Sequence, residues 1–311
     1  MKCNCCKPSN ELVHKKNETY EMDVCPVTFK VYNYVSFKKV KETKVKSQKN
    51  DKIVDKEKIK IEPVISKKID IPVNIIYNEK CEITMSKMKD SSIDYVFTSP
   101  PYNLSTTVSE KGKSGKMYKN FEDKSSQQDY YNWQVNLITE LLRVTKNHVF
   151  YNNQLLTNNK TALLTLLDYF KYKCKEVLVW DKKVAAPATT KGTFDSRFEL
   201  VIAFSNQTPN ERSFKDGNFH GTESNVINLH KTQNKLSYLN KAVFPINLPR
   251  KFMELFGKDG DIWYDPFGGT GTTGVAAVLA KKNYILSEMD ATQCKEAYKR
   301  IKEYINSPKL W

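Results

Sequence analysis

The chain has 311 residues, of which 40% are apolar and 12% aromatic, so it can bury one large core, or one core with an appendage. No apolar run approaches the roughly 20 residues of a membrane span, and the first residues lack the apolar stretch of a secretory signal, which excludes membrane-spanning and secreted classes. A formal net charge of +15 favours nucleic acid as a partner, although the codon bias of an AT-rich genome is an alternative source of the lysines. We therefore expect a soluble intracellular protein without membrane contact, in the cytoplasm or nucleoid, or in the nucleus of a eukaryotic host.

Residues 1–70 differ in composition from the rest of the chain, and we expect a basic, partly disordered N-terminal arm there. A weakly alternating stretch at 27–35 predicts a short strand or hairpin. Beyond it, lysines crowd a segment with little periodic apolar pattern, which either contacts phosphates or is merely solvated. These lysines are Lys38, Lys39, Lys41, Lys44, Lys46, Lys49, Lys52, Lys56, Lys58 and Lys60.

Seven cysteines, an odd number spread unevenly, argue against a disulfide framework. Cys3 and Cys6 have the Cys-x-x-Cys spacing of a zinc site, with His14 and Cys25 as conceivable further ligands. Because the downstream spacing matches no standard zinc finger, we expect reduced thiols and no metal.

The first motif lies at the end of an apolar run. A strand over 73–77 and a short helix over 82–88 precede a buried strand over 93–97, which runs into Thr98-Ser99-Pro100-Pro101-Tyr102-Asn103. Two consecutive prolines cannot donate hydrogen bonds to a neighbouring strand, so the strand must end there with its carbonyls free. Taken alone, the string is either a rigid turn with Tyr102 packed into the core or a catalytic loop.

The middle of the chain alternates between helical and strand-like patterns. Trp133, Leu137, Leu141 and Leu142 lie at helical spacing. We expect a helix over 129–145, a strand over 149–153, a helix over 155–170, and strands over 177–182 and 198–204. Most of these residues are expected in the core, so their value is topological.

A glycine-rich string lies between two predicted strands, at 262–264 and 284–288. It reads Asp265-Pro266-Phe267-Gly268-Gly269-Thr270-Gly271-Thr272-Thr273-Gly274 and leads into the apolar, helix-forming run 275–280. Glycines on a strand-to-helix turn let the backbone approach a ligand, and the helix start offers unpaired N–H groups, so we predict a nucleotide-like cofactor here. The second strand ends at Glu288, near the offset at which a carboxylate meets ribose hydroxyls. The alternative is a tight turn without a ligand.

Together, the two strings resemble the motifs of DNA methyltransferases that modify exocyclic amino groups. Ser99-Pro100-Pro101-Tyr102 is similar to their catalytic loop, and 265–273 is similar to their S-adenosylmethionine motif. The catalytic loop precedes the cofactor loop, as in the circularly permuted beta class of cytosine-N4 and adenine-N6 modification methylases. The resemblance covers roughly 72–305. It implies a Rossmann-like α/β catalytic domain over 71–311, with a mostly parallel seven-stranded sheet that finishes in an antiparallel hairpin.

The resemblance implies transfer of a methyl group from S-adenosyl-L-methionine to N4 of a flipped cytosine at a specific site in double-stranded DNA. Serine before Pro-Pro-Tyr is more typical of cytosine-N4 enzymes, and adenine N6 is the open alternative. More remote alternatives are RNA or protein-glutamine methylation and a catalytically silent DNA-binding protein. Cytosine C5 methylation is disfavoured because no cysteine follows a proline, which leaves only Cys81 and Cys174 as remote nucleophiles. A cognate restriction endonuclease is a candidate partner, and we expect a monomer or a homodimer.

The resemblance also assigns site residues. In the catalytic set, the Ser99 hydroxyl and the Pro100 carbonyl accept the hydrogens of the target amine, Pro101 completes the loop, and Tyr102 stacks on the base. The predicted cofactor-binding set is Asp265, Pro266, Phe267, Gly269, Gly271, Thr272, Thr273, Glu288, Phe244 and Pro245. The polar stretch 205–240 is the candidate target-recognition insertion, with predicted DNA contacts from Arg212, Lys215, Asn218, Lys231, Asn234 and Lys235. Where relatives carry Gly-Asp after the first strand, this chain has Glu79-Lys80, so a carboxylate near the cofactor is displaced or lost.

Overall fold

A computed structural model describes residues 13–16, 20–24, 31–36, 70–104, 125–183, 191–207, 211–230 and 243–307. The chain divides into two compact units, Met1–Pro63 and Val64–Trp311. In the first unit, strands β1 (Val13–Lys16), β2 (Tyr20–Val24) and β3 (Val31–Ser36) form an antiparallel sheet. The stretch at 27–35 thus contributes β3, and its partners come from residues for which no strand was predicted. The lysines at 38–60 and Cys3, Cys6 and Cys25 lie outside the described residues.

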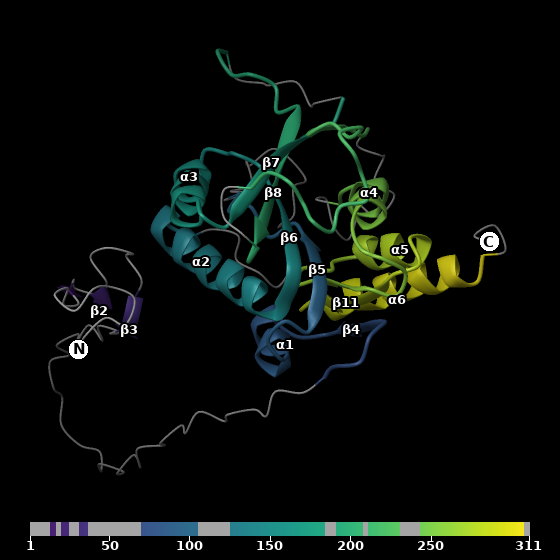
Figure 1. Cartoon of the computed structure of the whole chain (residues 1–311), viewed down its shortest axis with the longest axis horizontal. Coiled ribbons are helices and arrows are strands. Elements are labelled where there is room, and N and C mark those ends of the chain that lie inside the picture. Colours follow the sequence, from purple (N-terminus) through teal and green to yellow (C-terminus); the bar gives the residue numbers. More distant parts are fainter. Residues whose placement is uncertain are drawn as a thin grey trace, which may run out of the picture. The chain divides into compact units, whose positions relative to one another are not determined.

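The second unit is built on one eight-stranded sheet in the order β4-β11-β10-β5-β6-β8-β7-β9 (Figure 1). All neighbouring pairs are parallel except β6 with β8 and β8 with β7, so β8 alone runs against the other strands. The strands are β4 (Ile75–Tyr77), β5 (Ile93–Thr98), β6 (Thr145–Asn153), β7 (Cys174–Asp181), β8 (Phe198–Ser205), β9 (Val226–Asn228), β10 (Ile262–Asp265) and β11 (Asn283–Ser287).

The seven strands and the antiparallel hairpin implied by the family resemblance are present, the hairpin as β7 and β8. The sheet also has an eighth strand, which corrects the expected number. This strand, β9, lies in the polar stretch 205–240 and pairs with the outer edge of β7. Of its three residues only Ile227 is buried, so it carries too little apolar pattern to be recognised in the sequence.

Helices cover both faces of the sheet (Figure 1). One face packs on α1, α2 and α3, and the other on α4, α5 and α6. The helices are α1 (Cys81–Lys87), α2 (Gln127–Val144), α3 (Lys160–Tyr169), α4 (Asn247–Leu255), α5 (Thr272–Leu279) and α6 (Ala291–Ile305). Among the helices of the described residues, none is long and apolar enough to cross a membrane.

The central strands are apolar on both sides because both faces are covered. In β5, Val96 belongs to the core under α2, whereas Tyr95 and Phe97 belong to the core under α4 and α5. In β6, Val149 and Phe150 alternate in the same way. This continuous burial explains why 93–97 and 149–153 were recognisable as strands, although β6 begins earlier, at Thr145.

The permuted order brings two distant strands together. β10 pairs with β5 in parallel, with Trp263 opposite Tyr95 and Tyr264 opposite Val96. Parallel neighbours end at the same edge of a sheet, where ligands of open α/β folds bind. The loops that follow Thr98 and Asp265 therefore leave the sheet side by side, although 167 residues separate them in the sequence.

Candidate active site

The loop that follows β5 is held on several sides. Pro100 and Pro101 are buried, and the Pro101 carbonyl accepts a hydrogen bond of 2.7 Å from the Tyr130 hydroxyl on α2. The Asn159 side chain donates to the Tyr102 carbonyl at 2.8 Å. Asn103 has a positive φ of 57° and donates to two backbone carbonyls, those of residues 125 and 158. These contacts fix the loop independently of any ligand.

A polar cluster surrounds the tip of this loop. Ser99 Oγ lies 2.8 Å from the Tyr102 hydroxyl, which donates to Glu199 Oε2 at 2.9 Å. Asn152 Nδ2 donates to the Tyr102 hydroxyl and to Glu199 Oε2, both at 2.8 Å, and approaches Ser99 Oγ at 3.3 Å. Lys182 Nζ pairs with Glu199 Oε1 at 3.2 Å. Tyr102 is half-buried with its hydroxyl in this cluster, so it is not simply a core residue.

Asn152, Lys182 and Glu199 were not predicted as site residues. They come from the end of β6, the residue after β7 and the start of β8, which meet at the edge where β5 ends. The available signal was a polar residue inside an otherwise apolar strand, as Glu199 is in the run 198–204. Asn152 and Glu199 are both buried polar side chains.

Asp265 ends β10 and is 1% exposed. Its carboxylate accepts hydrogen bonds from Thr98 Oγ1 at 2.9 Å, Thr273 Oγ1 at 2.6 Å and the Phe267 N–H at 3.0 Å. Burial raises the pKa of this carboxyl to about 6, against the lowering effect of those hydrogen bonds. Asp265 thus links both loops through its hydrogen bonds. A direct contact of Asp265 with a ligand stays a prediction.

Two glycines of the second loop are also required by packing within the protein. A Cβ atom at Gly268 would stand 2.8 Å from Leu286, and one at Gly271 would stand 2.8 Å from the Ala297 side chain. Gly271 also has a φ of 82°. These two glycines allow the loop to pack against β11 and α6, and the contact of Gly271 with a cofactor stays a prediction.

Glu288 follows β11 and closes the same edge of the sheet. Its Oε2 accepts the Gly269 N–H at 3.0 Å, and its Oε1 accepts the Asp290 N–H at 2.8 Å. Burial raises the pKa of this carboxyl, partly offset by the two hydrogen bonds. The start of α5, the backbone of the loop and this carboxylate offer N–H donors and a hydroxyl acceptor together, which fits a ligand with an anionic group and a ribose.

The remaining members of the predicted cofactor-binding set have contacts within the protein. The Phe267 ring meets Trp133 of α2 edge-on at 5.8 Å, and the Phe244 ring meets Phe97 at 5.6 Å. Pro245, Pro266, Thr272 and Thr273 are buried. Their contacts with a cofactor stay predictions.

The segment 211–220 lies at the other end of the sheet. Asp216 accepts a hydrogen bond of 2.7 Å from Tyr95 and pairs at 2.7 Å with His148, both in the first half of their strands. Arg212 donates to Glu176 near the start of β7 at 2.7 Å. Asn218 donates to the Gly257 carbonyl at 3.1 Å, and Lys215 is exposed.

These contacts give Arg212 and Asn218 structural partners at the end of the sheet opposite the loop that follows β5. Their DNA contacts stay predictions, as does that of Lys215. Lys231, Asn234 and Lys235, the other predicted DNA contacts, lie outside the described residues.

The other polar candidates have structural explanations. Burial raises the pKa of the thiols of Cys81 and Cys174, which keeps both in the unreactive protonated form. Glu79 accepts from Thr84 at 2.8 Å and from Lys87 at 2.7 Å, so it has partners within the protein, and the displacement or loss of a carboxylate near the cofactor stays a prediction. Within the described ranges, no group of three His, Cys, Asp or Glu side chains could hold a metal ion.

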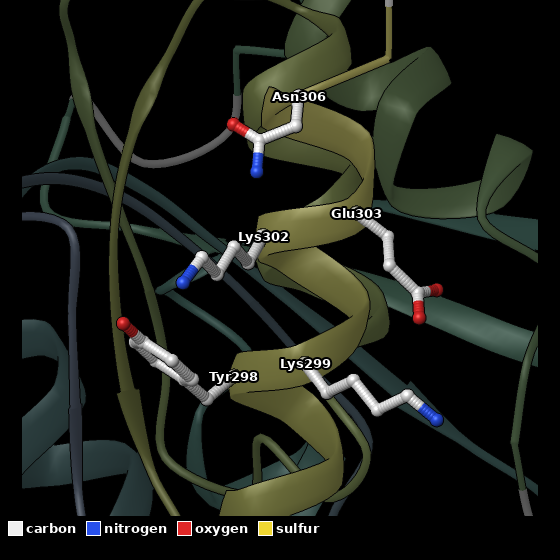
Figure 2. A pocket seen from close by; sticks show the side chains of 5 residues that line it. All are labelled: Tyr298, Lys299, Lys302, Glu303 and Asn306. Carbon is white, nitrogen blue, oxygen red and sulfur yellow. The ribbon is translucent and has the colours of Figure 1, made fainter.

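A hollow beside α6 is lined by Tyr298, Lys299, Lys302, Glu303 and Asn306 (Figure 2). In that view Tyr298 and Lys302 point to one side of the helix, and Lys299 and Glu303 to the other. Because all five residues come from α6 and its C-terminal cap, Asn306, and none belongs to the loops described above, we assign no ligand to this surface.

Comparison with known proteins identifies a family and a fold. The family described as DNA methylase matches residues 93–299. The type II methyltransferase M.MwoI of Methanothermobacter wolfeii is 27% identical over 216 residues, which are 65% of this chain, and the match spans 30% of that relative's length. The solved structure of the PvuII DNA methyltransferase (cytosine-N4-specific) has a TM-score of 0.56 at 16% identity, covering 74% of this chain and 90% of that one.

A further solved structure, TTHA0409 of Thermus thermophilus complexed with S-adenosyl-L-methionine, has a TM-score of 0.53 at 14% identity. It covers 75% of this chain and 94% of that one. At these identities the structural likeness concerns the fold.

Proposed function

The chain belongs to the DNA methylase family, and on this premise we propose that it transfers a methyl group from S-adenosyl-L-methionine to the exocyclic N4 amine of a flipped cytosine in double-stranded DNA. The observation that carries the proposal is the parallel pairing of β5 with β10. This pairing puts Ser99-Pro100-Pro101-Tyr102 beside the glycine-rich loop and Glu288, so that an amine and a methyl donor can meet at one edge of the sheet.

The proposed roles follow from the chemistry of the amine. An exocyclic amine of a nucleobase is a poor nucleophile because its lone pair is delocalised into the ring. Ser99 Oγ and the Pro100 carbonyl would accept its two N–H groups and favour a tetrahedral nitrogen with an available lone pair. In the part of the chain that the structure describes, the Pro100 carbonyl accepts no hydrogen bond, which leaves it available.

S-adenosyl-L-methionine, when bound, supplies an electrophilic methyl group. The new N–C bond would form as the bond between the methyl carbon and the sulfonium sulfur breaks, with the sulfur keeping the electron pair as a neutral thioether and the amino nitrogen losing one of its two hydrogens to solvent as a proton. The chain's contribution is to orient the amine and to exclude water, since direct transfer needs positioning and a preorganised site more than a covalent intermediate. The contacts of Pro101, Tyr102 and Asn103 with neighbouring elements provide that rigidity.

Gly269 and Glu288 would hold the cofactor. The Glu288 carboxylate, which accepts two backbone N–H groups, would accept the ribose hydroxyls, and the start of α5 would face the anionic end. The TTHA0409 complex, which shares the fold, supports this cofactor.

The choice of cytosine N4 over adenine N6 depends on Ser99, since serine before Pro-Pro-Tyr is the more typical cytosine form, and the PvuII likeness points the same way. Both bases offer the same amine to the same acceptors, so adenine N6 is the second candidate.

The experiment that tests the proposal is incubation of purified protein with tritiated S-adenosyl-L-methionine and mixed DNA, followed by nucleoside analysis. We expect label in N4-methylcytosine. Label in N6-methyladenine would reverse the base assignment, and label confined to RNA or protein would overturn the substrate.

A further inference from the structure

The Lys182–Glu199 pair is an unusual feature of the catalytic edge because it is buried. The Lys182 side chain is 8% exposed and the Glu199 side chain 11% exposed. Removing two charges from water costs about as much as their attraction returns, so a buried pair is weak support for stability by itself. Its position, directly behind the Tyr102 hydroxyl, points to a role in the site.

The hydrogen-bond order in this cluster can be worked out from the donors present. An ionised carboxylate only accepts, so the Tyr102 proton points to Glu199 Oε2. With its single proton used, the Tyr102 oxygen must act as the acceptor in its 2.8 Å contact with Ser99. The Ser99 proton therefore points to Tyr102, and the lone pairs of Ser99 Oγ are left for an incoming N–H group.

Asn152 and Lys182 make this order the favoured one. Asn152 Nδ2 has two hydrogens, and its shortest contacts, both 2.8 Å, are with the Tyr102 oxygen and Glu199 Oε2, which both accept. Lys182 Nζ donates to the other carboxylate oxygen, Oε1, at 3.2 Å, which leaves Oε2 to Tyr102 and Asn152. A neutral or absent group at Glu199 would free the Tyr102 proton to turn toward Ser99.

We propose that Glu199, held by Lys182, is a positioning residue that sets the donor order Ser99 to Tyr102 to Glu199 and so presents Ser99 Oγ to the target amine purely as an acceptor. The inference rests on the proposed function for its catalytic consequence. The hydrogen-bond order itself is a property of the free protein.

The test compares Glu199→Gln with Glu140→Gln, which changes a glutamate paired with Arg143 on α2, away from the loop. Hydrogen bonds to charged groups are among the stronger ones, so we expect the single-turnover methylation rate of Glu199→Gln to fall roughly 10- to 100-fold. Cofactor affinity, measured by calorimetry, should stay within twofold of the parent protein. Glu140→Gln should leave both unchanged.

A double-mutant cycle separates this role from general damage. Since Glu199 acts through the Tyr102 hydroxyl, Glu199→Gln should have little further effect in a Tyr102→Phe background. Independent, multiplicative losses would overturn the proposal, as would a parental rate in Glu199→Gln.

A readout without cofactor or DNA is the ¹³Cζ resonance of Tyr102 in tyrosine-labelled protein, assigned with Tyr102→Phe. Its chemical shift should change in Glu199→Gln and should not change in Glu140→Gln. An unmoved resonance would overturn the hydrogen-bond order. A moved resonance, in a protein that labels no DNA, would support the order while overturning the proposed function, so the two failures are distinguishable.

Discussion

Thr98 and Asp265, 167 residues apart in the sequence, are joined by a hydrogen bond of 2.9 Å between the threonine hydroxyl and the buried carboxylate. Thr98 directly precedes the proposed catalytic loop, Ser99–Tyr102, and Asp265 opens the glycine-rich loop. The same carboxylate accepts from Thr273 at the start of α5. One buried group therefore couples the placement of the proposed base site to that of the proposed cofactor site.

The stability of the protein should depend on the ionisation of Asp265. Burial raises its pKa from the ordinary 3.8 to about 6. Between these values the unfolded chain releases a proton that the folded chain keeps, so the free energy of unfolding falls as the pH rises through this window, by roughly 3 kcal/mol in all. Well below pH 3.8 both states are protonated, and the contribution vanishes.

Asp265→Asn removes the titrating carboxyl but can keep its hydrogen bonds. The amide oxygen can accept from Thr98 and the Phe267 N–H, and the amide nitrogen can donate to Thr273. Urea unfolding at several values between pH 4.5 and 7.5 should show the variant gaining stability relative to the parent as the pH rises. If the free energies of unfolding of the two proteins changed in parallel with pH, Asp265 would not be a buried carboxyl with a raised pKa.

Loss of the Ser99 acceptor should affect transfer and not cofactor binding. We expect Ser99→Ala and Tyr102→Ala to reduce the methylation rate by about 100-fold or more, because each removes a preorganised contact with the reacting amine or its ring. Calorimetry with S-adenosyl-L-methionine should give a Kd close to the parent value. An equal loss of cofactor affinity in both variants would contradict the division between the two loops.

Glu288→Ala should weaken the cofactor itself. The substitution removes the proposed ribose acceptor and also releases the Gly269 N–H, so we expect the Kd to rise about 10-fold or more. Glu288→Gln keeps an oxygen for one of the two N–H groups and should lie between the parent and Glu288→Ala. DNA affinity measured without cofactor serves as the control and should not change.

Two glycines with nearly the same φ allow a matched stability test. Gly271 and Gly260 have φ values of 82° and 84°, but a Cβ at Gly271 would strike Ala297, whereas one at Gly260 meets open space. Gly260→Ala should cost about 1–2 kcal/mol, the penalty for a left-handed residue. Gly271→Ala should cost roughly 1–3 kcal/mol more because of the clash. Equal losses in urea unfolding would mean that the loop can shift away from α6.

Much of the fold was accessible from the sequence because its central strands are buried on both faces. Continuous apolar runs ending at Thr98 and Asp265 marked β5 and β10, and the resemblance supplied their order in the sheet. Periodicity alone could not place the two strands side by side, since strand order is decided by packing between distant segments. The short β9 carried no readable pattern at all.

The candidate site was predictable where residues form contiguous strings and not where single side chains converge. Glu199 and Asn152 look like isolated polar residues in strands until the β6–β8 register brings them to Tyr102. The glycines were recognised, but their purpose at Gly271 depends on Ala297, which only the folded chain places beside it. Arg212 was chosen for its side chain, and its Glu176 partner could not be seen from spacing.

The lysines at 38–60 should contribute to DNA affinity through contacts with phosphates. Each lysine that neutralises a phosphate releases counterions, so log Kd depends on log salt with a slope of about 0.9 per contact. Replacing Lys44, Lys46 and Lys49 by glutamine should reduce that slope by up to about 3 while leaving sequence preference unchanged, because phosphate contacts do not distinguish bases. The matched control replaces Lys295, Lys299 and Lys302, three exposed lysines of α6, and removes the same charge. If both triple variants change the slope equally, net charge and not the arm attracts the DNA.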